Sequence, residues 1–320
     1  MADQARIEAE SWQIEREDEQ LRVDTFVRKR LPHLSRRQID SAIREQLFSL
    51  NGKATKKGDR VGAGDVLVFH GSRAWLAAQP SKNSNLEVRL VYEDSALLIV
   101  DKPAGMPTHG FSGRDDSTLA NFIAAQYPAL LGVGKSPWEP GILHRLDRET
   151  SGLVMIAKTQ SVFDEMRRRF RCREIAKTYW ALVWGKTGAS GTVALPLAHD
   201  PRDRRRMQAL NLPRRRAEKT WKAVTHYKKL AQSRGLSLLE IKMVTGVTHQ
   251  IRAHLAAIGH PIVGDRLYGK AESDAFGLQR HFLHAGQLDF YHSQGGRRLI
   301  VETSLPDDLR KLLLRLRIRI

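Results

Sequence analysis

Cysteine is almost absent from this sequence, since Cys172 is the only one among 320 residues. One thiol excludes an internal disulfide framework and every zinc site that needs several cysteine ligands. The twelve histidines form no His-Glu-x-x-His pattern and no other recognisable set of three ligands. We therefore expect no metal site, and the low cysteine content fits the reducing environment of the cytoplasm.

Long apolar runs are also missing. No stretch approaches the roughly 18 residues that a membrane-spanning helix needs, and Met1–Ala5 lacks the basic-then-apolar pattern of a secretory signal. Aromatic residues make up only 7% of the chain, which argues against broad aromatic stacking surfaces. We expect a cytoplasmic protein without a membrane partner.

Positive charge, in contrast, is abundant. Lys and Arg number 53 against 35 Asp and Glu, which gives a formal net charge of +18. A field of this sign attracts polyanions, above all nucleic acid. An anionic membrane surface is the alternative, but it calls for a basic amphipathic helix with exposed aromatic residues. Only the C-terminal helix comes close, and its leucine stripe is more simply explained as core.

Changes in composition divide the chain into four parts. The first is polar and mostly acidic, whereas from Leu21 the sequence turns basic and contains two short helical patterns and an Asn51-Gly52 turn signal. A polar stretch without periodicity follows and has the composition of a linker. The predicted parts are a polar tail (1–19), a small α/β module (20–76), a linker (77–86) and a large second domain (87–320).

Strand patterns outnumber helical patterns in the second domain and do not alternate strictly with them. This order predicts the α+β class with a mixed, largely antiparallel sheet, and it argues against a doubly wound parallel sheet. The predicted strands are 90–92, 96–100, 153–157, 178–184, 220–226 and 236–244, and the predicted helices are 117–126, 161–170, 249–258 and a last one after Pro306.

One segment carries a specific signature. His144-Arg145-Leu146-Asp147, followed by Thr150-Ser151-Gly152, places a carboxylate between two arginines before an apolar strand. Composition alone would favour a solvated turn with a surface ion pair. The motif, however, resembles the signature of the RluA-type pseudouridine synthases, and its seven specified positions make a chance match very rare. Further matches to that family follow in the expected order at 101–105, 176–183, 248–255, 259–265 and 283–285.

The resemblance implies a pseudouridine synthase fold and an RNA isomerase that needs no cofactor and no metal. It assigns the essential carboxylate to Asp147, a charged partner that holds this carboxylate to Arg252, and a ring that lies against the uracil to Tyr179. One position departs from the family pattern, because Val247 stands where an arginine usually precedes Thr-His-Gln. One RNA contact or loop-bracing pair is therefore in doubt.

The target base has to leave its stack to reach a carboxylate. Arg145 is long and planar and could fill the vacated place, with a simple phosphate contact as the alternative. His144 is grouped with the RNA-binding residues, although a structural role is the competing interpretation. The strongly basic segment 199–222 predicts a hairpin that closes over RNA, with a solvated charged loop as the alternative. In this hairpin, Arg204, Arg205, Arg206 and the run 214–216 would flank a short apolar tip at Met207–Leu212.

The module at 20–76 resembles the S4 RNA-binding domain. The residues that carry this likeness and are expected to contact RNA are Arg22, Ser35, Arg36, Arg37 and Lys53. This pair of domains resembles synthases that act on large-subunit ribosomal RNA, which makes ribosomal RNA the expected substrate. Transfer RNA is the first alternative, and an RNA-binding assembly factor without activity is the second. We expect a monomer.

Overall fold

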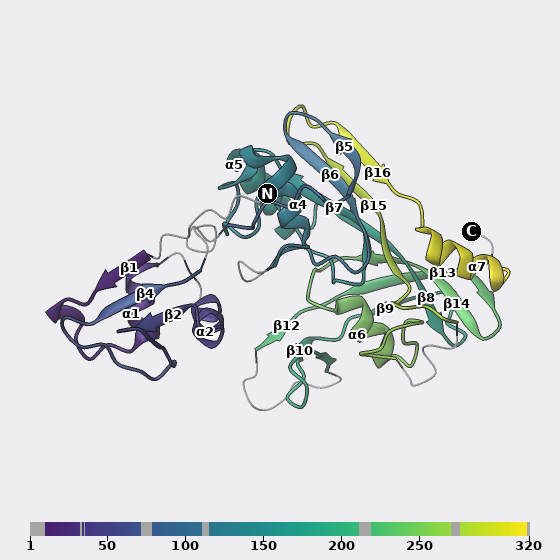
Figure 1. Ribbon diagram of the computed structural model, residues 1–320. Coiled ribbons are helices and arrows are strands. Elements are labelled where there is room, and N and C mark those ends of the chain that lie inside the picture. Colours follow the sequence, from purple (N-terminus) through teal and green to yellow (C-terminus); the bar gives the residue numbers. More distant parts are fainter. Residues whose placement is uncertain are drawn as a thin grey trace. The chain divides into compact units, whose positions relative to one another are not determined.

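The computed structural model describes residues 10–32, 34, 36–71, 79–110, 115–210, 219–269 and 276–318. The chain forms two compact units, shown as ribbons in Figure 1. The first unit combines the N-terminal residues up to 87 with 109–140, and the second combines 88–108 with 141–320. None of the helices in the described part of the chain is long and apolar enough to cross a membrane.

A four-stranded sheet and two helices make up the N-terminal part of the first unit. The hairpin between β2 and β3 turns at Asn51-Gly52, where both residues have positive φ, as a two-residue turn of this kind requires. Phe26, Phe48 and Phe69 are fully buried between helices and sheet. The elements are β1 (Glu10–Gln13), α1 (Val23–Arg30), α2 (Arg36–Arg44), β2 (Phe48–Leu50), β3 (Lys53–Ala54) and β4 (Val66–Phe69), with the strand order β1-β4-β2-β3.

The structure differs from the predicted polar tail at its end. Glu10–Gln13 pair antiparallel with β4, and the adjacent Ile14 is 2% exposed in the core. Strand β1 lies at the edge of the sheet and is largely exposed, so its sequence shows almost no apolar alternation. The acidic composition of this segment therefore gave no indication that it forms an edge strand.

Residues 109–140 pack in the first unit. Helix α4 (Leu119–Gln126) begins with a capping box, in which Thr118 and Asn121 each accept a hydrogen bond from the backbone N–H of the other. Asn121 also donates to the carbonyl of Ser81 at 2.7 Å. The predicted linker is thus hydrogen-bonded to this segment. Trp138, beyond the short helix η2 (Pro128–Leu130), joins the core formed by β2, β4 and α1.

The second unit is built on a nine-stranded sheet. All its strand pairs are antiparallel except β7 with β15, which agrees with the predicted α+β class. Strand β15, from the C-terminal part, lies between β7 and β8 at the centre. The strands are β5 (Arg89–Glu93), β6 (Leu97–Lys102), β7 (Ser151–Ala157), β8 (Ala176–Trp184), β9 (Ser190–Val193), β13 (Thr225–Ser233), β14 (Leu236–Met243), β15 (Leu283–Tyr291) and β16 (Arg298–Glu302).

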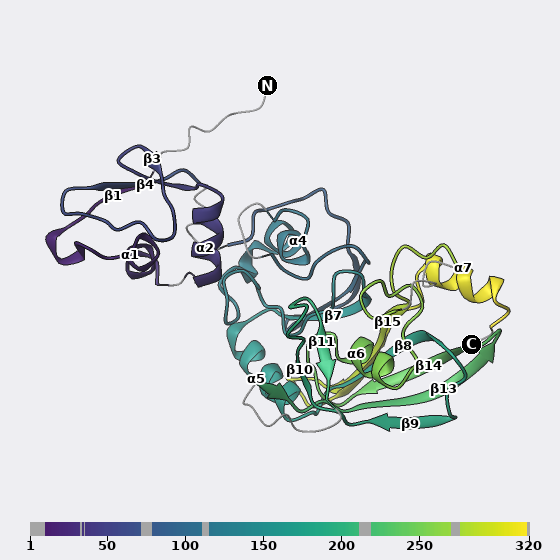
Figure 2. The same ribbon diagram turned by 90° about the horizontal axis from the view of Figure 1, so that it is seen from below.

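In the described part of this unit three α-helices accompany the sheet, and each was predicted: α5 (Gln160–Arg171), α6 (Gln250–Ala257) and α7 (Asp307–Arg315). Helix α5 packs beside β7, and α6 contacts β13. Helix α7 lies at the far ends of β13 and β14 in both views (Figures 1 and 2), where Ser233 Oγ donates to the carbonyl of Leu316 at 2.9 Å. Its leucine stripe is buried, as expected.

The basic segment forms a small sheet of β10 (Leu197–His199), β11 (Met207–Ala209) and β12 (Thr220–Trp221). The predicted apolar tip is wrong, because Met207 is a buried strand residue that packs on α6 and the turn comes earlier, at 200–206. An apolar run between two arginine clusters is compatible with a loop tip and with a buried strand, so the sequence alone does not distinguish the two. The second cluster, 214–216, lies outside the described residues.

Candidate active site

The signature segment forms a loop that enters the buried strand β7. At Gly152 the backbone has a φ of +120°, and a Cβ atom there would lie 2.2 Å from the carbonyl oxygen of Ala285 on β15. Only glycine allows this approach, since both the conformation and the space exclude a side chain. The glycine therefore fixes where the loop meets the sheet.

Hydrogen bonds hold the loop on both sides of Asp147. Thr108 Oγ1 donates to the carbonyl of Leu146 at 2.9 Å and accepts from its N–H at 3.1 Å. On the other side the fully buried Lys102 donates from Nζ to the carbonyls of Pro103, Met106 and Arg148. The carboxylate is thus carried by a backbone with little freedom to move.

Arg252 connects Asp147 to a second carboxylate. Its Nη1 donates to Asp147 Oδ2 at 3.0 Å, while Nε and Nη2 donate to the two oxygens of Asp265 at 2.7 and 2.9 Å. Asp265 is fully buried and also accepts the backbone N–H groups of Leu267 and Tyr268. A bidentate pair of this kind fixes the plane of the guanidinium, so Asp265 aims Arg252 at Asp147.

The pKa of Asp147 lies below its usual range. Burial by itself would raise it, but the charges of His249, Arg252 and His281 and the hydrogen bond from Arg252 outweigh burial. Burial lowers the pKa of His281 to about 4 and also lowers that of His249. Both rings are therefore mainly neutral at pH 7, and Arg252 is the partner that keeps Asp147 ionised there.

His249 precedes α6 with a φ of 54° and lies beside the same carboxylate. Its Nε2 is 3.8 Å from Asp147 Oδ2, and its Nδ1 is 3.0 Å from the hydroxyl of Tyr268. The Tyr268 hydroxyl accepts the N–H of Met207 at 2.6 Å, which links the small sheet to the site. Arg206 places its guanidinium 5.2 Å from the centre of the Tyr268 ring.

Tyr179 extends from β8 into the same cavity as Asp147. Burial, together with the charge of Asp147, raises the pKa of Tyr179, so the phenol stays protonated at every physiological pH. Its hydroxyl hydrogen-bonds to none of the residues that the structure describes. Tyr179 is 5% exposed, and at the cavity its hydroxyl is left for a bound molecule.

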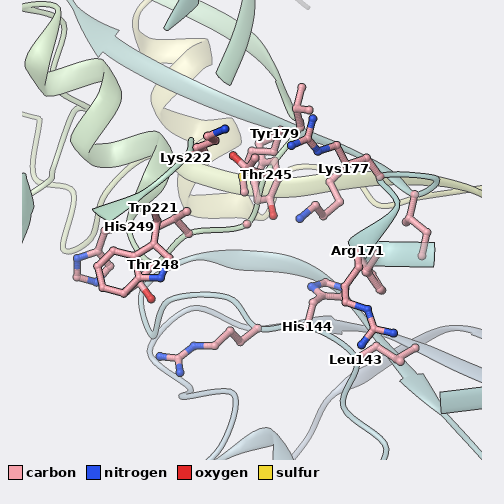
Figure 3. Close-up of a pocket in the computed structure, with 18 of the residues that line it drawn as sticks. Leu143, His144, Arg171, Lys177, Tyr179, Trp221, Lys222, Thr245, Thr248 and His249 are labelled. Carbon is pink, nitrogen blue, oxygen red and sulfur yellow. The ribbon is translucent and has the colours of Figure 1, made fainter. Parts of the chain in front are cut away.

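Asp147, Tyr179 and His249 line a cavity of about 520 Å³, and Arg252 reaches it through its hydrogen bond to Asp147. Pockets of this size hold small molecules or single nucleotides. Lys177 and Tyr179 come from β8, Thr245 to His249 from the segment after β14, and His144 to Asp147 from the signature loop (Figure 3). The three residues that the resemblance assigned to the reaction, Asp147, Tyr179 and Arg252, therefore meet at one site.

The other predicted RNA contacts are distributed more widely. His144 lies in the cavity wall, where its Nε2 accepts the N–H of Met155 at 3.1 Å, whereas Arg145 is exposed at the cavity. Arg205 pairs with Asp203 on the surface. Arg204 is in the turn before β11.

Arg22, Arg36 and Lys53 belong to the first unit, and Arg22 pairs there with Asp24 at 3.0 Å. Ser35 and the side chain of Arg37 lie outside what the structure describes.

Val247, the departure from the family pattern, packs beside the buried cluster of β10, β11 and α6. Its N–H donates to Gln250 Oε1 at 3.1 Å, so the loop is braced without an arginine. In the described part of the chain, no three His, Cys, Asp or Glu side chains come together as metal ligands would.

Comparison with known proteins decides the family. The model of the family described as RNA pseudouridylate synthase matches residues 96–257, and that of the S4 domain matches 21–67. The chain belongs to the RNA pseudouridylate synthase family. It is an RNA pseudouridine synthase with an N-terminal S4 domain, as the motifs predicted.

Relatives of this pseudouridine synthase cover nearly its whole length. Ribosomal large subunit pseudouridine synthase D of Nitrosomonas europaea is 34% identical over 92% of this chain and 83% of its own. An RNA pseudouridine synthase of Chloroflexus aurantiacus is 37% identical over 93% of this chain and 90% of its own. Among solved structures, human RNA pseudouridylate synthase domain containing 4 superimposes with a TM-score of 0.56 at 26% identity, over 72% of this chain and 94% of that one.

Sequence reasoning assigned no role to Asp265, His249, Tyr268 or Lys102. A single signal pointed to Asp265, which ends the matched segment 259–265 and lies thirteen residues after Arg252. Nothing in that spacing shows that the two side chains form a bidentate pair, because an irregular segment separates them.

Proposed function

We propose that this synthase converts uridines of large-subunit ribosomal RNA to pseudouridine and that Asp147 is its essential carboxylate. The observation that carries the assignment is the pairing of Asp147 with Arg252, which is itself fixed by the buried Asp265. An ionised, oriented carboxylate at a nucleotide-sized cavity is what the reaction requires.

The reaction is an isomerisation. The bond between ribose C1′ and uracil N1 breaks, the base turns, C1′ bonds to C5, and the proton lost from C5 is balanced by the one gained at N1. No electrons enter or leave and no water is consumed, so a single carboxylate suffices where a glycosidase that activates water uses two. Asp147 acts in this scheme as the nucleophile or the base.

Tyr179 and Arg252 have supporting parts in the proposal. The ring of Tyr179 packs against the extruded uracil, and its protonated hydroxyl donates to a polar atom of the nucleotide. Arg252 keeps Asp147 ionised while the base is turned. Arg145, exposed at the cavity, fills the space in the RNA stack or holds a phosphate.

The choice of ribosomal RNA is supported by relatives named ribosomal large subunit pseudouridine synthase D, which are 32–34% identical to this chain. The S4 domain supplies a second RNA-binding surface. The monomeric state, the cytoplasmic location and the absence of a metal remain predictions.

The test compares Asp147→Asn with the wild type on unmodified transcripts of large-subunit ribosomal RNA and of transfer RNA. Asparagine keeps the shape and removes the charge, so pseudouridine formation is expected to vanish while RNA affinity stays within a few-fold. Asp307→Asn, in the exposed first turn of α7, is the matched control and is expected to behave as wild type. Pseudouridine is mapped by carbodiimide labelling and primer extension, and affinity is measured by filter binding.

Each part of the proposal can fail separately. A turnover by Asp147→Asn of one tenth of the wild-type rate or more would remove Asp147 from the reaction. Conversion of transfer RNA without conversion of ribosomal RNA would contradict the assignment of ribosomal RNA as the substrate. A wild-type protein that binds both RNAs and converts neither would support the binding protein without activity.

A further inference from the structure

The cavity at Asp147 has a second, basic end that the proposed chemistry leaves without a role. The side chains of this end come from α5, the turn after it, β8 and the strand end at β12, and they are Arg167, Arg171, Arg173, Lys177 and Lys222. Asp147 is the single carboxylate among the lining residues, and it is already paired with Arg252. Among the described residues, five cations thus face the cavity and no second carboxylate lines it.

Arg167 stands out within the arginine run of α5. Its two neighbours are neutralised, since Arg168 pairs with Glu174 at 3.2 Å and Arg169 pairs with Glu165 at 2.6 Å. Arg167 pairs with no carboxylate of the described residues. One of its Nη atoms donates to the carbonyl of Leu143 at 2.9 Å, but its buried Nε has no hydrogen-bond acceptor.

Lys177 faces the same end from the sheet. It is half-buried, and its Nζ lies 5.7 Å from the centre of the Phe170 ring. In the described part of the chain it forms neither a hydrogen bond nor an ion pair. Gly246, after the neighbouring strand β14, lies beside the ammonium group, since a Cβ atom there would be 3.4 Å from Nζ, in ordinary contact.

The positive charges of Arg167 and Lys177 repel each other when no anion is bound in the cavity. Burial lowers the pKa of Lys177 to about 8, and no carboxylate offsets this. Burial and the charges of Lys177 and Arg167 together lower the pKa of His144 to about 3, so this ring adds no charge of its own. A bound anion would weaken the repulsion between these positive charges. It would also accept hydrogen bonds from the unused N–H groups of Arg167 and Lys177.

We propose that Arg167 and Lys177 form a subsite for one phosphate of the RNA strand, next to the nucleoside at Asp147. This inference rests on the proposed function, since it takes the target base to be the one at Asp147. Lys177 and Tyr179 are two residues apart on one face of β8, so their Cα atoms are about 7 Å apart. One nucleotide spans such a distance, with its base at Tyr179 and its phosphate at Lys177. In Figure 3 these two side chains lie side by side, with His144 and Arg171 across the cavity.

Phosphate is the anion that fits best. A guanidinium offers a planar pair of donors and an ammonium a compact charge, and phosphate oxygens accept both. The net charge of +18 already favours a polyanion over an isolated carboxylate. The subsite therefore fixes which nucleotide of the RNA strand lies at Asp147, independently of the identity of its base.

The first experiment scans a synthetic RNA stem-loop in which one linkage at a time near the target uridine is an uncharged methylphosphonate. Affinity is measured by filter binding for the wild type and for Lys177→Met. At one linkage we expect the methylphosphonate to weaken wild-type binding about tenfold, as loss of a charged contact does. Lys177→Met should bind the unmodified RNA about tenfold more weakly and should lose nothing further at that linkage.

Lys242→Met is the matched control. Lys242 lies on the neighbouring strand one register position from Lys177 and therefore faces the other side of the sheet. This variant should remain as sensitive to the methylphosphonate as the wild type. If Lys177→Met is also as sensitive as the wild type at every linkage, the subsite does not exist.

The second experiment uses pH. If Lys177 binds phosphate in its charged form, wild-type affinity should fall about tenfold between pH 7 and pH 9, because the charged fraction of free Lys177 falls by that factor around pH 8. Lys177→Arg, which keeps its charge, should bind equally well at both pH values. The charged and titratable groups that line the cavity with Lys177 are His144, Arg145 and Asp147 from the signature loop, Arg167, Arg171 and Arg173 from α5 and its turn, Tyr179 from β8, Lys222 beside β12, and His249 before α6.

An equal loss of affinity in the wild type and Lys177→Arg would overturn the proposal. Both experiments measure binding, so they stand apart from the role of Asp147. An inactive Asp147→Asn with the expected methylphosphonate pattern supports both proposals, and an active one with the same pattern refutes only the catalytic assignment.

Discussion

Changing each of the two carboxylates that share Arg252 to asparagine is expected to affect stability to different degrees. Asp265 is fully buried and accepts four hydrogen bonds, two of them from Arg252. Asp147 is 20% exposed at its side chain and accepts one from Arg252. The first carboxylate stabilises the fold, whereas the second is held for the reaction.

The cost of Asp265→Asn follows from these contacts. An asparagine oxygen can keep the three bonds made at Oδ1, but its NH2 group then meets the Nε–H of Arg252 donor to donor. A charged hydrogen bond is lost and a buried guanidinium is left half-paired, which together cost about 3 kcal/mol. Asp147→Asn leaves the Asp265 pair intact, so its cost should stay below about 1 kcal/mol.

A urea titration monitored by hydrogen exchange of β8 and β15 peptides isolates the second unit. With a slope of about 2–3 kcal/mol per molar urea, Asp265→Asn should lower the midpoint by about 1–1.5 M. Asp265→Asn should also lower kcat by a larger factor than it changes KM, because Arg252 loses its orientation. A midpoint within about 0.2 M of wild type, or a larger loss for Asp147→Asn, would refute the assignment of roles to the two carboxylates.

Three further predictions concern acid, backbone space and salt. The pKa values of Asp147 and Asp265 are lowered, so the stability these carboxylates contribute is full above about pH 4 and is lost as the pH falls through their folded-state pKa values; the urea midpoints of wild type and Asp265→Asn should therefore draw together as the pH falls below about 4. Gly152→Ala should destabilise the protein by more than about 4 kcal/mol, whereas Gly235→Ala, with positive φ but nothing within 4 Å, should cost about 1 kcal/mol, as urea titration would show. The slope of log affinity for RNA against log salt concentration, measured by filter binding, should be steeper than about −3, which corresponds to about four neutralised phosphates. A slope near zero would show that the positive charge of the protein does not drive RNA binding.

The parts of the structure that could be predicted are those with a strong pattern. Alternating or continuous apolar residues gave the central strands and the helices α5 and α7, because burial imposes a period on the sequence. The signature loop gave Asp147, and matching segments gave Tyr179 and Arg252; the structure places Asp147 and Tyr179 at one cavity and joins Arg252 to Asp147. These residues lie in motifs long enough to be specific.

The parts that could not be predicted depend on distant contacts. Strand β1 is an exposed edge strand without alternation, and Met207 is buried only because α6 packs on it. Lys102 is a fully buried lysine, a residue type that composition alone would assign to the surface. Its position follows from three backbone carbonyls that come together only in the fold.

The central place of β15 has a consequence for the order in which the enzyme is made. The ribosome releases the segments that hold Asp147, Tyr179 and Arg252 before it releases residues 283–291. Until that strand emerges and inserts between β7 and β8, the strand that the Asp147 loop enters and the strand that carries Tyr179 have no common neighbour. A nascent chain should therefore remain inactive until residues 283–291 have emerged, and its activity should then arise in a single step.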